Sequence, residues 1–177
     1  MRHLGFAVFD RGELISFGVR AFQGERNKGR LLSKIEVCVD RLVERHAPQT
    51  LAVEEVFYAQ ARMNGHLRRL VAQVKRRGRM RRLRVASYLP TAVKDRVCQD
   101  KPTRQTLAEA MVRRFWFLYA FLKPGRTRHY WQQMFDAVAL GAVAIDDATP
   151  GRGGARNECG GSAFPSLCNP RKAVAAR

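Results

Sequence analysis

Hydrophobic residues recur with two different periods along the first third of the chain. Stretches 4–9 and 14–21 are apolar and flank the turn-forming residues 10–12, a pattern that predicts a β-hairpin. From 27 to 46 the apolar residues fall on one stripe at helical spacing, which predicts an amphipathic helix. The segment TLAVEEVF, 50–57, predicts a short strand that is apolar as far as its two acidic residues.

Strands and helices continue to alternate along the chain. The patterns predict a helix over 62–77, a strand over 83–89, a short helix over 90–97 and a further helix from about residue 103. The segment 129–145 carries apolar residues on nearly every face, which predicts a helix packed into the core. Such alternation is typical of the α/β class.

The chain divides into a folded part and a tail. Residues 1–147 have the size and hydrophobic content of one domain, whereas 148–177 are rich in Gly, Pro and Arg and predict a disordered tail. No apolar stretch approaches the roughly 20 residues that span a bilayer, and no apolar signal core follows Met1. We therefore expect a cytoplasmic protein without a membrane partner.

Positive charge dominates the composition. The chain has 33 Lys and Arg against 15 Asp and Glu, a formal net charge of +18, which favours nucleic acid as the partner. No acid occurs between Glu55 and Asp95. Such a run is either a solvated face or a surface for phosphates, and repulsion between its members favours the second. Its basic residues are Arg62, Arg68, Arg69, Lys75, Arg76, Arg77, Arg79, Arg81, Arg82, Arg84 and Lys94.

Two carboxylates stand out against this background. Glu54 ends an apolar strand, and Asp136 is the only acid between Glu109 and Asp146, on the helix that is apolar nearly all round. Each has a plain interpretation: a solvated strand end for Glu54 and a salt bridge for Asp136. The alternative is that both bind one hard cation such as Mg²⁺, which prefers oxygen ligands and can assist the cleavage of a phosphodiester.

Four segments resemble the RuvC-type Holliday-junction resolvases, over roughly residues 2–145. They are RHLGFAVFDRGELISFGV, LAVEEVF, VASYLPTAVK and FDAVALGAVA, in the family's order and spacing. The resemblance implies a ribonuclease-H-like fold, an α/β mixed sheet flanked by helices. It also implies an endonuclease that cuts branched DNA.

The resemblance assigns a role to several residues. Glu54 and Asp136 take the places of metal ligands, with two Mg²⁺ or Mn²⁺ ions expected in each site. Lys94 takes a basic position in the active site, and Arg104 takes a second one. Gln133, which stands where the family has an acid or histidine, could ligate through its carbonyl oxygen. The residues expected to contact DNA are Phe57, Arg62, Arg68, Arg69 and Lys101, the last also being an alternative to Arg104.

The chain also departs from the family. Met1 stands where the family's Asp-Pro-Gly loop would be finishing, so the first strand and its aspartate are missing, and Asp10 lies too far away to replace it. Losing a central strand would leave backbone groups unpaired at about 1–3 kcal/mol each where they are buried. We therefore expect the natural start to lie roughly ten to twenty residues upstream, the length of a strand and its loop.

Three functions are compatible with these patterns. The first is a Mg²⁺-dependent endonuclease for four-way junctions, acting as a homodimer and in company with a junction-binding or branch-migration complex. The second is an inactive module of the same fold that binds nucleic acid, and the third is another ribonuclease-H-like nuclease or a transposase. One apolar stripe could be a dimer face or ordinary core: Leu67, Leu70, Val71 and Val74.

Overall fold

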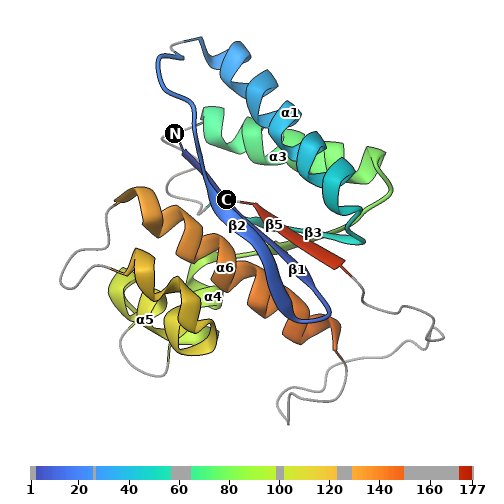
Figure 1. The fold of residues 1–177 in the computed structure, drawn as a ribbon. Coiled ribbons are helices and arrows are strands. Elements are labelled where there is room, and N and C mark those ends of the chain that lie inside the picture. Colours follow the sequence, from blue (N-terminus) through green and yellow to red (C-terminus); the bar gives the residue numbers. More distant parts are fainter. Residues whose placement is uncertain are drawn as a thin grey trace.

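Within the residues that the computed structural model describes (3–25, 27–56, 65–98, 102–122, 129–149 and 172–176), a mixed sheet of five strands lies between two layers of helices (Figure 1). The strands are β1 (His3–Asp10), β2 (Glu13–Ala21), β3 (Thr50–Glu54), β4 (Arg84–Tyr88) and β5 (Lys172–Ala176), in the spatial order β2-β1-β5-β3-β4. The helices are α1 (Lys28–His46), α3 (Gly65–Met80), α4 (Pro90–Val97), α5 (Arg104–Arg114), the 3₁₀ helix η1 (Trp116–Phe121) and α6 (His129–Ala148).

The predicted hairpin and helices are confirmed with small shifts in their ends. β1 and β2 pair antiparallel, and the turn between them places Arg11 at φ 51° and Gly12 at φ 89°. Positive φ at both turn residues matches the twist of a two-residue hairpin loop. Helix α1 begins where Asn27 accepts hydrogen bonds from the amides of Gly29 and Arg30, at 2.8 and 3.1 Å.

The sheet has a separate core on each face, because side chains alternate along every strand. Phe6 and Val8 of β1 pack under α1 and α3, whereas Ala7 and Phe9 pack under α4, α5 and α6. Figure 1 shows the same division, with α1 and α3 on one side of the strands and α4, α5 and α6 on the other. This alternation decides which face each strand-end residue points to.

The central strand comes from an unexpected part of the chain. Residues 172–176 were predicted to belong to a disordered tail, but they form β5, which is antiparallel to β1 and parallel to β3. Strand β5 therefore fills the position between β1 and β3. The facing edges of β1 and β3 need hydrogen-bond partners, and a short apolar segment supplies them. Residues 150–171 of the predicted tail lie outside the described residues.

The apolar stripe of α3 is at least partly core. Leu70 and Val74 are 4% and 3% exposed and pack with α1 and the sheet. These two residues are therefore not available as a dimer face, and a homodimer stays a prediction. None of the described helices has the length and apolar character needed to cross a bilayer.

Candidate active site and nucleic-acid interface

Glu54 lies at the carboxyl end of β3, where it pairs in register with Tyr88 of the neighbouring parallel strand. Ala52, two residues earlier, packs into the core under α6. Since alternate residues of a strand point to the same face, the side chain of Glu54 points to the α6 side of the sheet. Its carboxylate is half-buried.

Asp136 lies in α6 and is only 5% exposed. Its Oδ1 accepts a hydrogen bond from Nε2 of Gln132, one helical turn earlier, at 3.0 Å. Gln132 is itself 3% exposed, so this bond fixes the orientation of the carboxylate inside the protein. Sequence reasoning missed Gln132, although a polar residue four positions before a buried acid on an apolar helix is a readable signal.

Gly5 sets the distance between β1 and the first turns of α6. A Cβ atom on this residue would lie 1.9 Å from the backbone oxygen of Gln133, so the helix backbone rests directly on the strand. Phe6 and Val53 both pair with Ala176 of β5, which places Gly5 and Glu54 in the next row of the sheet at the same end. With a strand spacing of about 4.8 Å, they are roughly 10 Å apart.

The candidate active site is thus Glu54, Gln133 and Asp136. Glu54 ends β3 on the α6 side of the sheet, Gln133 lies over Gly5 at the same end, and Asp136 follows Gln133 by about one helical turn. The carboxyl ends of strands are where α/β sheets commonly place ligands.

We expect Gly5→Ala to destabilise the protein by about 1–3 kcal/mol or more, because the new methyl group meets backbone and not a movable side chain. Urea unfolding measures the loss. Gly65→Ala is the matched control, since no atom lies within 4 Å of a Cβ at that helical position. Equal stability of the two variants would contradict the close approach of β1 to α6.

Oxygen donors at this end of the sheet suit a hard cation, although they are few. The two carboxylates and the amide oxygen of Gln133 are of the type that Mg²⁺ prefers, and such ions are often held by one or two carboxylates together with water and substrate phosphate. No group of three or more His, Cys, Asp or Glu side chains suited to a metal occurs among the described residues.

The predicted basic residues lie on several different elements. Lys94 is half-buried on α4, which follows β4 directly, and Arg104 is the exposed first residue of α5. Arg68 and Arg69 are exposed on α3. Three further predicted DNA contacts lie outside the described residues: Phe57, Arg62 and Lys101.

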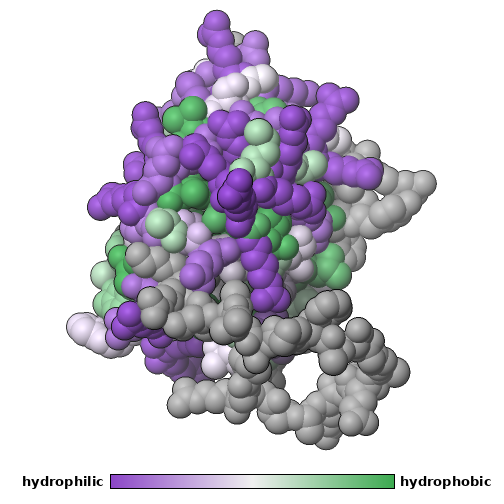
Figure 2. Space-filling model, turned by 90° about the vertical axis from the view of Figure 1, so that its right-hand side faces the viewer, coloured by the Kyte–Doolittle hydropathy of each residue, from purple (hydrophilic) through white to green (hydrophobic). Residues whose placement is uncertain are grey.

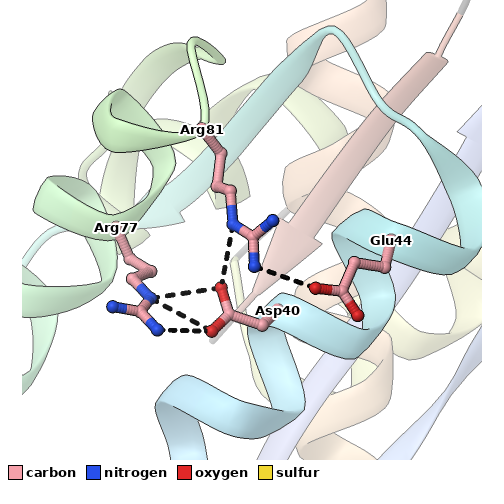
Figure 3. Close-up of polar contacts among 4 residues, drawn as sticks. All are labelled: Asp40, Glu44, Arg77 and Arg81. Carbon is pink, nitrogen blue, oxygen red and sulfur yellow. Dashed lines mark hydrogen bonds and ion pairs between the residues drawn. The ribbon is translucent and has the colours of Figure 1, made fainter.

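Part of the basic run is neutralised within the protein. Arg77 of α3 and Arg81, which directly follows that helix, both reach Asp40 of α1, at 2.7 and 3.5 Å, and Arg81 also pairs with Glu44 at 2.9 Å (Figure 3). The Arg77 guanidinium, hydrogen-bonded to the carboxylate, holds the pKa of Asp40 below its usual value. Acids on α1 therefore neutralise part of the positive charge of this run, and the rest remains available to an anionic partner.

Ion pairs also fix the far end of α6. Asp147 accepts hydrogen bonds from Arg96 of α4 at 2.6 and 2.9 Å, and Asp146 accepts two from Arg114 of α5 at 2.9 and 3.0 Å. Burial, together with a hydrogen bond to Asp147, raises the pKa of Tyr88 to about 12. Helix α6 is therefore positioned at both ends, by these contacts and by Gly5.

Comparison with known proteins agrees with this architecture. The family model described as "Crossover junction endodeoxyribonuclease RuvC" matches residues 2–144. The structure resembles Thermus thermophilus RuvC in complex with a Holliday junction substrate, at 19% identity and a TM-score of 0.62, covering 83% of this chain and 89% of that one. It also resembles a second Thermus thermophilus RuvC structure, at 18% identity and a TM-score of 0.60, covering 84% and 92%.

A search of curated protein sequences found no match. The two structural neighbours confirm the predicted ribonuclease-H-like fold, a mixed sheet with helices on both faces. Because the family match spans most of the chain, the protein belongs to the RuvC family of crossover junction endodeoxyribonucleases.

Proposed function

We propose that the protein is a metal-dependent endonuclease that cuts branched DNA, with four-way junctions as its preferred substrate. The observation that carries the proposal is the placement of Glu54 and Asp136 at one end and on one side of the sheet, within a chain of this family. A net charge of +18 supports a nucleic-acid substrate.

Each residue of the site has a defined part in the proposed reaction. Glu54 and Asp136, with the amide oxygen of Gln133, would hold Mg²⁺ or Mn²⁺, two ions in the full site. Bound there, the metal supplies an activated water and stabilises charge on the phosphodiester. Gln132 keeps the Asp136 carboxylate in one orientation, so that no reorganisation is needed when substrate arrives.

The cations would act on the substrate. Lys94 and Arg104 would stabilise negative charge that develops on the phosphate during in-line attack by water. Arg68 and Arg69 would contact the DNA backbone outside the site, together with Phe57, Arg62 and Lys101. A homodimer would present two such sites to a junction that has near two-fold symmetry, and a junction-binding or branch-migration complex would be its partner.

A second candidate function is a DNA-binding module without catalytic activity. It is favoured by one observation, the lack of any group of three or more acidic, Cys or His side chains among the described residues. Gln133, which contributes no charge where the family has an acid or histidine, points the same way. This module would bind junctions and never cut them.

Substrate comparison separates these functions. We expect the full chain, with Mg²⁺, to cut a four-way junction at least about tenfold faster than a linear duplex, a flap or an RNA–DNA hybrid of the same arm sequences, since two paired sites match the symmetry of the junction. Denaturing gels measure the cuts, and gel shifts in EDTA measure binding. Preferred cutting of the hybrid would indicate another nuclease of this fold, and tight binding with no cuts would indicate the module.

A further inference from the structure

A groove of about 650 Å³ runs between the end of β2 and one side of α1. Four cations line it, Arg20 from β2 and Lys34, Arg41 and Arg45 from α1, and Val37 and Cys38 of α1 are also in its lining. Among the described residues, no acidic side chain lines it. We call it the basic groove.

Helix α1 separates its charges between two sides. Asp40 and Glu44 face α3, where Arg77 and Arg81 neutralise them (Figure 3). The cations of the basic groove lie on the opposite side of the helix, toward β2. Asp40 and Glu44 are therefore committed to these two arginines and do not neutralise the cations of the groove.

The groove cations keep most of their charge available. Lys34 pairs with Glu25 at 2.9 Å, but no ion pair in the described part of the chain involves Arg20, Arg41 or Arg45. In Figure 2, hydrophilic residues cover most of the upper part of the molecule, at the height of α1 and α3 in Figure 1, and hydrophobic residues form only small patches. Such a surface suits a polyanion better than an apolar partner.

Arg20 and Arg41 both influence the Cys38 thiol, which lines the groove. Burial raises the pKa of this thiol, and the charges of the two arginines oppose that shift. Arg20 also lies over the ring of Phe6, 5.9 Å from its centroid. These contacts fix Arg20 at one end of the line of cations.

The groove starts at the candidate active site's end of the sheet. Arg20 pairs in register with Leu4, next to Gly5, on which Gln133 rests. From Lys34 to Arg45 the helix extends away from that end by about 16 Å at 1.5 Å per residue. One strand of B-DNA carries a charge about every 3.4 Å, so this length corresponds to roughly five phosphates.

We propose that the basic groove binds the phosphate backbone of a DNA arm that leads away from the candidate active site. This inference rests on the proposed function for its choice of DNA, and it adds a contact surface distant from the cutting site. A line of cations without acids fits a regularly spaced polyanion, whereas an acidic peptide would need fewer charges and deeper apolar pockets.

The test compares two double variants with equal loss of charge. Arg41→Gln/Arg45→Gln removes two groove cations, and Arg11→Gln/Arg113→Gln removes two exposed arginines from the hairpin turn and from α5. Binding to a linear duplex and to a four-way junction is measured in EDTA over a series of salt concentrations. Cutting of the junction at saturating DNA is measured separately with Mg²⁺.

We expect the groove variant to bind both DNAs at least about tenfold more weakly at low salt, with the slope of log K against log salt reduced by about 2, since each lost phosphate contact removes about 0.9. The control variant should keep the wild-type slope, and cutting at saturation should be unchanged in both.

The two proposals fail in different ways. If the wild type cuts junctions and the groove variant keeps the slope of the control, the basic groove does not hold DNA and the proposed function stands. An unchanged slope would also be the result if the groove served an acidic peptide. If the wild type binds DNA through the basic groove but never cuts, the proposed nuclease activity is wrong and the proposal for the groove stands. Failure of the wild type to bind any DNA would overturn both.

Discussion

Val174→Asp is expected to unfold the protein. Val174 is the middle residue of β5, is 1% exposed, and pairs with Val8 of β1 and Leu51 of β3 at the centre of the sheet. A carboxylate at this position would enter the core under α1 and α3. Burying an unpaired charge costs several kcal/mol, and losing the strand to avoid this cost would expose the edges of both neighbours.

This cost is a large share of the total stability of a domain, about 5–15 kcal/mol. Far-UV circular dichroism and urea unfolding should therefore show a protein that is largely unfolded, or that has lost more than half of its free energy of unfolding. Val37→Asp is the matched control, because Val37 is 48% exposed on α1 and because valine and aspartate have similar helix propensities. That variant should unfold within about 0.5 kcal/mol of the wild type.

The comparison tests whether β5 completes the sheet. If Val174→Asp and Val37→Asp are equally stable, residues 172–176 do not contribute a central strand, and the slot between β1 and β3 must be occupied in another way.

The sequence predicted the periodic elements well because their signals are local. The apolar stripe of α1, the Arg11-Gly12 turn and the run that ends at Glu54 each reflect a period or a turn preference that neighbouring residues enforce. The burial of Asp136 was also predictable, since its helix is apolar nearly all round.

What could not be predicted depends on partners distant in the sequence. β5 has only five residues, and it follows a stretch whose Gly, Pro and Arg content predicts disorder. Its placement comes from the hydrogen-bonding demand of β1 and β3, which no local pattern displays. The pairing of Asp40 with Arg77 is similar, because α1 and α3 each show their charge pattern but not the packing that joins them.

The family resemblance predicted the site from motifs, and the fold brings the segments that carry those residues to one end of the sheet. Glu54 alone reads as a solvated strand end. The alternation of β3 turns it toward α6, and the contact of Gly5 with Gln133 holds the first turns of α6 over the same end of the sheet. The single glycine in β1 was a readable signal for such a close approach.

Glu54→Gln and Asp136→Asn are expected to lower the rate of junction cutting by at least about a hundredfold each while leaving junction binding in EDTA intact. Both changes keep the shape of the side chain and remove its charge, so a metal ion loses a ligand without loss of packing. Single-turnover cleavage with saturating enzyme measures the chemical step, and circular dichroism checks the fold.

The chain offers a matched control for each carboxylate. Glu55 follows Glu54 directly but pairs with Lys75 of α3, and Asp146 lies on α6 but pairs with Arg114. Glu55→Gln and Asp146→Asn should therefore cut at close to the wild-type rate. If they lose as much activity as the site variants, general loss of negative charge and not the candidate site explains the effect.

The same four variants decide between a nuclease and a binding module. In a nuclease, substitution of Glu54 or Asp136 lowers cutting but not binding, whereas substitution of Glu55 or Asp146 changes neither. In a module, the wild type cuts nothing, and removing negative charge from a basic protein strengthens DNA binding at all four positions by similar small factors. The carboxylates of Glu54 and Asp136 repel phosphate unless a cation lies between them. DNA binding by the wild-type protein should therefore respond to Mg²⁺ only if the protein is the nuclease.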